Sequence, residues 1–421
     1  MLNSKSEREL AYVVIIDGIK PIEGYDRVEH AIVGGWRVIV QKDQFKVGDP
    51  AIYFEIDSRV PSDRECFAFL EKRHYKVKTL KMCKTLSQGL LMHASDFGWI
   101  IENSAIDDHP VIIDDEGKSH YATDESRFLT QKLGVTYADD EDNSRKAPSV
   151  DKYKKMEMRH RKLFKNPVIH WFMRYKFGRK VMFFFFGKKK DKKDTAFPTQ
   201  FPYIKKTDQE RCENMVFVLQ DKTPYIRTQK CDGSSGTFIL ARKKKFGRTK
   251  YEFFVCSRNV RMLKPEQECF YGEHNYYWEV AIKYDIENKL RDYLEKHSEL
   301  EYVCWQGEVC APKIQANAHQ LKETHLYLFH MIDSIKGFYD IREAKKIWEQ
   351  YKMEFVPIED ELYILPDDFE EFKLTADGVY DASVCEGKKN VPREGFVYYK
   401  STDPNFSFKN VSRKYLLKQD F

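Results

Sequence analysis

Short apolar runs separated by turn residues occupy the first hundred residues of the chain. The candidate strands are residues 11–19, 28–32, 36–40 and 51–56, and the runs at 76–82 and 89–93 continue the pattern. Gly34-Gly35 and Gly48-Asp49-Pro50 are turn signals between or beside them. Five or six short strands in about 100 residues are typical of a small barrel, for which an OB-like fold is the most economical solution. A purely structural β-module is the alternative.

The second half of the chain mixes strand and helix patterns. Residues 251–255 and 326–332 are apolar runs of strand length, and the second is typical of a buried strand. Apolar side chains recur at helical spacing within residues 276–295, which predicts one helix facing a core: Trp278, Ala281, Ile282, Ile286, Leu290 and Leu294. Residues 341–351, rich in Lys and Glu, predict a second helix. The pattern predicts an α+β domain.

The tetrapeptide Lys230-Cys231-Asp232-Gly233 opens a series of short motifs. Taken alone, it predicts only a polar β-turn with Asp-Gly at its tip. The motifs that follow are Ser257-Arg258-Asn259, Trp305-Gln306-Gly307-Glu308-Val309, the run from Leu326 to Asp333, Arg393-Glu394-Gly395-Phe396-Val397-Tyr398 and Phe406-Ser407-Phe408-Lys409-Asn410-Val411. Their order and spacing, over about residues 200–421, resembles the covalent nucleotidyltransferase superfamily of polynucleotide ligases and mRNA capping enzymes.

The resemblance implies that Lys230 is a nucleophile that takes AMP from ATP. An amine that attacks phosphorus must be neutral, whereas a free lysine has a pKa of about 10.4. The resemblance places Lys409 and a divalent metal close to the Lys230 amine, where positive charge would lower its pKa and neutralise charge on the phosphates. The same resemblance implies that Asp232, Glu308 and Glu394 hold Mg²⁺ or Mn²⁺, partly through water, as suits a hard cation.

The resemblance also implies residues that bind the nucleotide. Phe329 stands where the superfamily sets an aromatic ring against adenine, although its apolar surroundings equally predict packing in a buried strand. Arg258 stands where a basic side chain meets ribose or phosphate, and a plain surface arginine is the alternative. Gln229 would meet the adenine edge through its amide. Asp232, Gly233, Glu308 and Glu394 complete the expected nucleotide-binding set. The chain contains no Gly-x-x-x-x-Gly-Lys-Ser/Thr sequence, so a P-loop is not expected.

The last motif departs from the superfamily pattern, which usually has two lysines separated by one residue. Here Ser407 and Val411 flank Lys409 at that spacing, so only one lysine is present. Arg413 and Lys414 follow closely and are candidates for the second charge.

The expected order of the domains indicates which branch of the superfamily the chain resembles. Capping enzymes and DNA ligases carry an OB-fold after the last motif, whereas twelve residues follow Lys409 in this chain, so we expect the extra domain in front. An OB-like domain ahead of the nucleotidyltransferase domain is similar to one class of ATP-dependent RNA ligases. Ser87-Gln88-Gly89-Leu90 and the segment Lys206 to Arg211 also resemble that class.

We therefore expect three parts: an OB-like β-barrel domain at 1–110, a linker or insert at 111–195, and the nucleotidyltransferase domain at 196–421. The last part is expected to contain antiparallel sheets with flanking helices.

The expected linker is strongly polarised in charge. Residues 101–150 contain 12 acidic and 5 basic side chains, whereas residues 152–193 contain 16 basic and 2 acidic ones together with many aromatic rings. The basic stretch is too short and too charged to span a bilayer. Three interpretations stand: a solvated linker, an amphipathic segment on an anionic membrane, and contact with nucleic-acid phosphates. We favour the third, in which Lys188 to Lys193 take part.

Composition is consistent with a globular enzyme of two or three domains, since 42% of the 421 residues are hydrophobic and 14% aromatic. The nine cysteines form no Cys-x-x-Cys pair, which favours a reducing compartment over a disulfide framework or a zinc site. The N-terminus lacks the apolar core of a signal peptide, so we expect an intracellular protein that is not secreted and has no membrane partner.

The expected function is ATP-dependent ligation of RNA 3′-OH and 5′-phosphate ends through lysyl-AMP and an RNA-adenylate, with a nicked duplex as a candidate substrate. An ATP-dependent DNA ligase and a GTP-using capping enzyme are the alternatives within the superfamily. A non-catalytic RNA-binding protein on the same fold is the alternative of another class.

Overall fold

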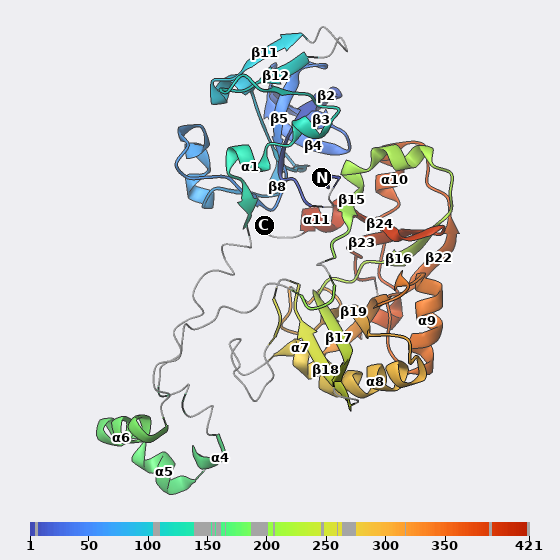
Figure 1. The fold of residues 1–421 in the computed structure, drawn as a ribbon. Coiled ribbons are helices and arrows are strands. Elements are labelled where there is room, and N and C mark those ends of the chain that lie inside the picture. The colour runs from blue at the N-terminus through green and yellow to red at the C-terminus, as the bar shows by residue number, and fades with distance from the viewer. Residues whose placement is uncertain are drawn as a thin grey trace.

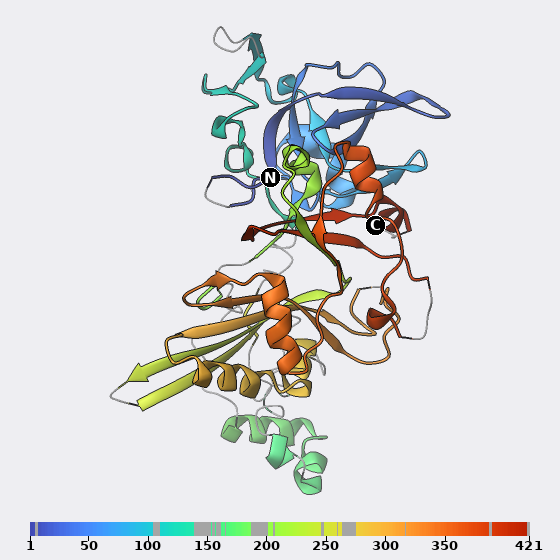
Figure 2. The ribbon, with the colours of Figure 1, turned by 90° about the vertical axis from the view of Figure 1, so that its right-hand side faces the viewer.

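The computed structural model describes residues 1–4, 7–103, 110–138, 153, 156, 161–164, 166–186, 201–204, 207–245, 248–258, 260–262, 275–315, 317–386 and 390–418. Figures 1 and 2 show an N-terminal β-rich domain, a larger C-terminal domain of sheets and helices, and a small group of helices, α4 to α6. The predicted α+β class is confirmed.

The N-terminal domain is built from short antiparallel strands. In one sheet, β5 (Pro50–Phe54) lies between β1 (Ala11–Ile15) and β10 (Leu90–Met92). In another, β2 (Gly18–Ile22), β3 (Tyr25–Val33) and β4 (Trp36–Gln41) form a meander. The single strand expected at residues 11–19 is thus divided, because its first part pairs with β5 and the part beyond Asp17 pairs with β3.

Smaller strand pairs complete this domain. They are β6 (Ser58–Arg59) with β7 (Lys76–Val77) and β14 (Thr136–Tyr137), β8 (Leu80–Met82) with β9 (Thr85–Ser87), and β11 (Ile100–Asn103) with β12 (Pro110–Ile113) and β13 (Ser119–His120). The helix α1 (Thr130–Leu133) buries Leu133 in the same core as Val13 and Phe54. Because α1 and β14 pack into this domain, we propose that it extends to Ala138 rather than ending at residue 110.

Two five-stranded sheets form the C-terminal domain. The first has the order β15 (Glu210–Arg211), β24 (Asp403–Val411), β23 (Gly395–Lys400), β16 (Tyr225–Gln229) and β22 (Ile358–Tyr363). The second has the order β18 (Arg248–Cys256), β17 (Ser234–Lys245), β19 (Tyr302–Cys310), β20 (His325–Asp333) and β21 (Gly337–Phe338). The chain passes from one sheet to the other through residues 230–233, so the Lys230 motif is the connection between them.

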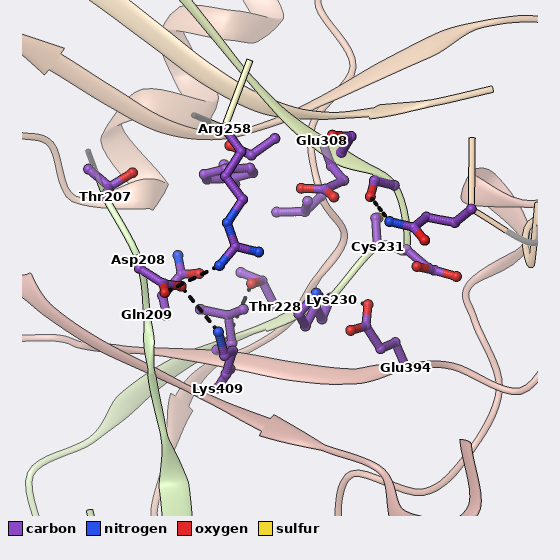
Figure 3. A pocket seen from close by; sticks show the side chains of 18 of the residues that line it. Thr207, Asp208, Gln209, Thr228, Lys230, Cys231, Arg258, Glu308, Glu394 and Lys409 are labelled. Atoms are coloured by element: carbon purple, nitrogen blue, oxygen red, sulfur yellow. Dashed lines mark hydrogen bonds and ion pairs between the residues drawn. The ribbon is translucent and has the colours of Figure 1, made fainter. Parts of the chain in front are cut away.

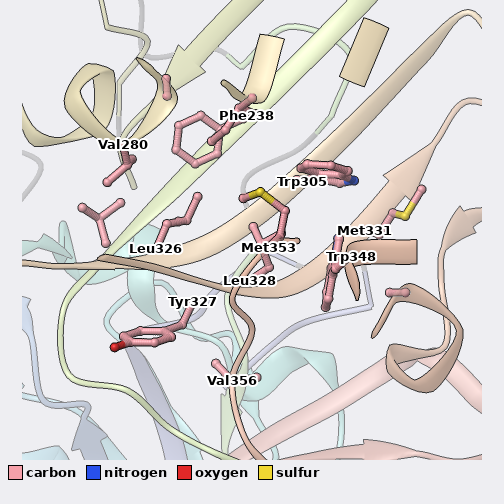
Figure 4. Packing of buried hydrophobic residues seen from close by; sticks show 14 of the residues in the cluster. Phe238, Val280, Trp305, Leu326, Tyr327, Leu328, Met331, Trp348, Met353 and Val356 are labelled. Carbon is pink, nitrogen blue, oxygen red and sulfur yellow. The ribbon is translucent and has the colours of Figure 1, made fainter. Parts of the chain in front are cut away.

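Helices pack against the second sheet and enclose the main core. They are α7 (Tyr276–Lys283), α8 (Ile286–Lys296) and α9 (Ile341–Gln350). Buried side chains from strands and helices meet there, including Phe238, Trp305, Leu328 and Trp348 (Figure 4). The helix predicted at 341–351 is confirmed, whereas the one predicted at 276–295 is two helices. Asp285 breaks it in a left-handed conformation (φ 51°), which Asp tolerates better than most residues.

Residues at the start of the C-terminal domain, just after β15, contact the N-terminal domain. The Asn214 amide donates to Glu55 (2.7 Å), a fully buried carboxylate, and accepts from the Trp36 indole N–H (2.5 Å). The Gly35 N–H donates to the Glu213 carbonyl (2.9 Å). Helix α10 (Phe369–Leu374) carries Lys373, which binds the Glu213 side chain. Helix α11 (Arg413–Lys418) lies close to β9 of the N-terminal domain.

The remaining helices are α4 (Arg161–Phe164), α5 (Pro167–Phe172) and α6 (Lys176–Phe186). They fall within the basic, aromatic stretch, and Figure 1 shows them grouped apart from both domains. Lys188 to Lys193, expected to contact phosphates, lie outside the described residues. Among the helices that the structure describes, none is both long and apolar enough to cross a membrane.

Removing the Lys373 amine should destabilise the protein strongly. Lys373 is 2% exposed and donates to the Glu213 carboxylate (2.8 Å) and the Val411 carbonyl (2.9 Å). Lys373→Ala would leave the Glu213 carboxylate buried without its cation, at a cost of about 3–5 kcal/mol in the free energy of unfolding. Denaturant unfolding measures this, with Lys346→Ala on the exposed face of α9 as the control, which should change stability by less than about 0.5 kcal/mol. Equal stability of the two variants would contradict the prediction.

Candidate active site

A cleft of about 540 Å³ lies between the two sheets of the C-terminal domain. All nine residues singled out from the sequence line it: Gln229, Lys230, Asp232, Gly233, Arg258, Glu308, Phe329, Glu394 and Lys409. The first sheet supplies Lys409 on β24, and Lys230 and Glu394 next to the ends of β16 and β23. The second sheet supplies Glu308 on β19 and Phe329 on β20, with Arg258 just beyond β18. Figure 3 shows the polar members pointing toward one another.

The Lys230 amine lies among carboxylates. Its Nζ donates to Glu394 Oε2 (2.8 Å), and its backbone N–H donates to the Gly395 carbonyl (3.0 Å). Burial by itself would lower the pKa of Lys230, but Glu394, Glu308 and Asp232 outweigh burial and raise that pKa above its ordinary value. Lys409 and a divalent metal together were expected to lower the Lys230 pKa, and Lys409 by itself does not outweigh the carboxylates. In the protein alone the carboxylates determine it, and the amine is an ammonium ion.

The carboxylates near Lys230 carry more negative charge than the amine balances. Burial raises the pKa of Glu308 to about 7, with Glu394 and Asp232 adding to the rise and Lys230 opposing it. Burial also raises the pKa of Glu394, again against the effect of Lys230. Buried carboxylates with raised pKa values gain stability from a further cation. Three hard oxygen donors in one cleft therefore fit a divalent metal such as Mg²⁺ or Mn²⁺.

Lys409 and Arg258 are joined by an acidic side chain that was not assigned a role from the sequence. Asp208 Oδ1 accepts from Lys409 Nζ (3.2 Å), and its Oδ2 lies 3.4 Å from an Arg258 nitrogen. Burial would raise the pKa of Asp208, but Lys409, Arg258 and Arg8 hold it below its usual range. Burial lowers the pKa of Lys409, and Asp208 opposes that effect. Two cations, one from each sheet, thus stand in the cleft with the Asp208 carboxylate between them.

The structure shows which cation lies near Lys409, where the last motif lacks its second lysine. Arg413 pairs with Glu370, and Lys414 pairs with Asp377 (3.0 Å), so both candidates engage groups other than the cleft. Arg258 lies beside Lys409 instead, through Asp208. The second positive charge next to Asp208 thus comes from a side chain distant in sequence.

The structure gives different surroundings to the residues that were expected to bind the nucleotide. Phe329 lines the cleft and also packs against the main core, so its position is compatible with both expected roles. Apolar side chains of Val260, Met262 and Val356 line the cleft as well. The Gln229 amide, in contrast, donates to Glu359 Oε2 (2.8 Å) and accepts from the backbone N–H of Asp381 (2.8 Å). Both ends of this amide are thus paired within the protein while Gln229 lines the cleft, and its contact with the adenine edge stays a prediction.

Gly233 is required by a close approach of backbones. A Cβ atom at this position would lie 2.5 Å from the Val309 carbonyl oxygen and 2.7 Å from Cys310 Sγ. The glycine therefore lets the Lys230 motif pass directly over β19, which carries Glu308. Its contribution to the site is this proximity of Lys230 and Glu308, and no side chain could replace it without moving one strand.

Three residues outside the motifs hold the nucleophile segment in place. His319 is buried, and its Nε2 accepts from the backbone N–H of Asp232 (2.9 Å). The Tyr380 hydroxyl donates to the Lys230 carbonyl (3.0 Å) and accepts from the backbone N–H of Glu394 (3.1 Å). The rings of His319 and Tyr380 lie 4.3 Å apart. Tyr415, on α11, donates to Asp232 Oδ2 (2.5 Å). No short motif marks these residues, which come from three distant segments.

Comparison with known proteins gives one match in each of the two domains. A family model described as an OB-fold domain matches residues 10–94, and one described as RNA ligase matches residues 223–416. No curated protein matches the sequence.

Solved structures of a Naegleria gruberi RNA ligase share the fold. An apo form of a mutant aligns with a TM-score of 0.65 and 24% identity over 98% of each chain. A mutant with ATP and Mn gives the same TM-score and identity over 98% of this chain and 99% of the other, as does a mutant with AMP and Mn. The chain therefore contains an RNA ligase domain with an OB-fold domain ahead of it, and it shares the fold of these solved RNA ligase structures.

Proposed function

We propose that this RNA ligase is ATP-dependent, that it joins 3′-OH and 5′-phosphate RNA ends, and that Lys230 carries the AMP. The observation that supports this most strongly is the position of Lys230, the one lysine paired with Glu394 in a cleft that also presents Glu308, Asp232, Lys409 and Arg258. The Naegleria gruberi structures with ATP, AMP and Mn add support, since the same fold holds adenine nucleotides there.

The reaction has three transfers. Lys230 Nζ, after losing its proton, forms a bond to the α-phosphorus of ATP, and the bond to the bridging oxygen breaks to release pyrophosphate. The oxygen of an RNA 5′-phosphate then attacks the same phosphorus, and the lysine nitrogen leaves and regains a proton. Finally the 3′-OH attacks the 5′-phosphate phosphorus, and AMP leaves. Each step is an in-line displacement, so positioning and charge stabilisation supply most of the catalysis.

The residues divide these tasks between the two walls of the cleft. Glu394 holds the Lys230 amine in place before reaction and is the group nearest to its proton. Lys409 and Arg258 face the cleft as cations and would stabilise charge on phosphate oxygens, once those oxygens compete with Asp208 for them. The half-buried ring of Phe329 offers a face to adenine.

Asp232, Glu308 and Glu394 would hold Mg²⁺ or Mn²⁺, directly or through water. When bound, such an ion supplies positive charge that offsets the carboxylates and stabilises the negative charge of the phosphates. The raised pKa values of Glu308 and Glu394 are consistent with these ligands, because burial disfavours the charged carboxylates and a bound cation would offset that cost.

Two further expectations belong to this proposal. The RNA ends include those at a nick, since the OB-fold domain lies next to the ligase domain and both could contact one duplex. The protein works in a reducing, intracellular compartment, which the eight free cysteines among the described residues support.

Replacing the nucleophile should abolish transfer of AMP to the protein. We expect wild-type protein incubated with α-labelled ATP and Mg²⁺ or Mn²⁺ to carry label through denaturing electrophoresis, and Lys230→Ala to carry none, because no other amine lies at its position. GTP should give no label, which separates the proposal from a capping enzyme. Lys222→Ala, an exposed lysine just before β16, is the matched control and should label normally. Label in Lys230→Ala would refute the assignment, and absence of wild-type label would favour a binding protein.

Binding of Mn²⁺ should weaken as the pH falls through 7. Ligand carboxylates must be deprotonated to bind a metal, and the Glu308 pKa is about 7, so protons compete with the ion below that pH. We expect the apparent affinity to fall about tenfold for each pH unit below 7, since the deprotonated fraction falls by that factor. A titration of free Mn²⁺ by electron paramagnetic resonance measures this. Glu308→Gln should bind more weakly and show a flatter profile, and an unchanged profile would exclude Glu308.

The Tyr380 hydroxyl and the His319 ring should act as positioning groups. Tyr380→Phe removes one bond to Lys230 and one to the Glu394 backbone, so we expect the rate of AMP transfer to fall by about tenfold with little change in the ATP KM. His319→Gln can still accept from the Asp232 N–H and should retain more activity than His319→Ala.

Tyr351→Phe, which removes a hydroxyl bound to Asp292 away from the cleft, is the control for Tyr380→Phe. A wild-type rate in Tyr380→Phe, or equal rates in the two His319 variants, would contradict positioning by these groups.

A further inference from the structure

Helices α5 and α6 expose large aromatic rings although they have a core of their own. Met173 and Met182 are buried in a hydrophobic cluster whose described members all lie within residues 153–186. On the outside, Trp171 is 55% exposed, Phe177 72% and Phe184 81%. Rings exposed to this extent contribute little to the cluster, and a group of them on one small unit is typical of a binding surface.

Cationic side chains are interleaved with these rings. Lys176 and Lys180 are exposed on α6, and Arg174 is exposed between the two helices. Phe177, Lys180 and Phe184 are spaced three and four residues apart, so they form one stripe along α6, with Lys176 at its side. Tyr175 lies beside Trp171, with 5.1 Å between ring centroids. We call Trp171, Tyr175, Lys176, Phe177, Lys180 and Phe184 the basic-aromatic surface.

The alternation of aromatic rings and cations along α6 indicates which of two anionic partners, a membrane or a nucleic acid, fits this surface. A helix that lies on a membrane separates its faces, with apolar side chains toward the lipid and cations on the opposite side. A single-stranded nucleic acid instead presents base faces and phosphates along the same strand, and proteins bind it with aromatic rings and cations in one groove or stripe. On α6, rings and cations share one stripe, which matches the second partner. The charge of residues 152–193, with 16 basic and 2 acidic side chains, complements phosphates.

On the basis of the ligase function above, we propose that the basic-aromatic surface binds the single-stranded part of the RNA substrate outside the ends being joined. Bases stack on Phe177, Phe184 and Trp171, and phosphates pair with Lys176 and Lys180. The surface adds affinity for RNA and takes no part in the transfer of AMP to Lys230, because none of its residues lines the cleft.

The test uses the whole 421-residue chain and measures separately how charge and how base stacking contribute to RNA binding. Binding of a fluorescent oligouridylate is followed by anisotropy over a series of salt concentrations. Lys176→Glu/Lys180→Glu should weaken binding at low salt and flatten the slope of log affinity against log salt by about 1.4, that is about 0.7 for each of two lost phosphate contacts. Phe177→Ala/Phe184→Ala should weaken binding at least about fivefold and leave the slope unchanged.

Matched controls lie elsewhere on the surface. Lys345→Glu/Lys346→Glu on α9 changes charge by the same amount, and Ile335→Ala removes another exposed apolar side chain; both should bind RNA as the wild type does. All variants should attach AMP to Lys230 at the wild-type rate, which shows that they fold and tests the ligase chemistry separately from RNA binding.

Two results would overturn the proposal. One is that both surface variants bind RNA with the same affinity and the same salt slope as the controls. The other is loss of binding to phosphatidylserine vesicles in Phe177→Ala/Phe184→Ala with RNA binding intact, which would assign the surface to a membrane. Failure of AMP attachment in every protein, wild type included, would instead overturn the proposed ligase function and leave the RNA-binding result to stand by itself.

Discussion

The buried charge around the Lys230 amine is the constraint on which the rest of the site depends. The Lys230 ammonium group and the carboxylates of Glu394, Glu308 and Asp232 are partly buried together in one cleft. Their charges do not balance, and an excess of buried negative charge is costly unless a further cation is present. The protein alone therefore holds Lys230 in its protonated, unreactive form. Positive charge brought by a metal would satisfy the carboxylates and also allow the amine to lose its proton.

The fold provides this arrangement by joining two sheets at the nucleophile. Residues 230–233 leave one sheet and enter the other, so Lys230 necessarily lies where the sheets face each other. Gly233 brings this segment close to β19 and hence to Glu308. Gly395 does the same for Glu394, since its backbone (φ 150°) follows β24 so closely that a Cβ would lie 2.1 Å from the Asn410 carbonyl oxygen. Two glycines thus set the distances between the groups that carry charge.

Residues 207–214 connect this chemistry to the OB-fold domain. Asp208 pairs with Lys409 and Arg258 in the cleft, while Asn214 binds Glu55 and Trp36 of the N-terminal domain. Arg8 lies between the two, with its guanidinium 2.9 Å from Glu55 and 3.2 Å from Glu210. Because Glu55 is fully buried, the two domains are held by charged hydrogen bonds that lose their partners if the domains separate. The orientation of Lys409 and Arg258 is therefore coupled to the packing of the OB-fold domain.

The sequence predicts those parts of the site that depend on local motifs. Lys230, Asp232, Glu308, Glu394 and Lys409 were found because each lies in a short motif whose chemistry requires that residue type. The role of Asp208 as a bridge, and those of His319 and Tyr380 as supports, depend on contacts between distant segments that no local pattern records. The pairing of Gln229 with Glu359 and the Asp381 backbone was not expected, because these neighbours in space are far away in sequence. The break at Asp285 was missed because apolar spacing continues through it.

The most direct test of the account is a measurement of the Lys230 pKa. Nuclear magnetic resonance of the Lys230 side chain gives this pKa in protein with and without Mg²⁺ and a non-hydrolysable ATP analogue. The account predicts a pKa above the ordinary lysine value of about 10.4 in the protein alone, because three carboxylates surround the amine. It predicts a lower pKa once Mg²⁺ is bound. A Lys230 that is already neutral near pH 7 without a divalent ion, or a pKa that Mg²⁺ leaves unchanged, would contradict it.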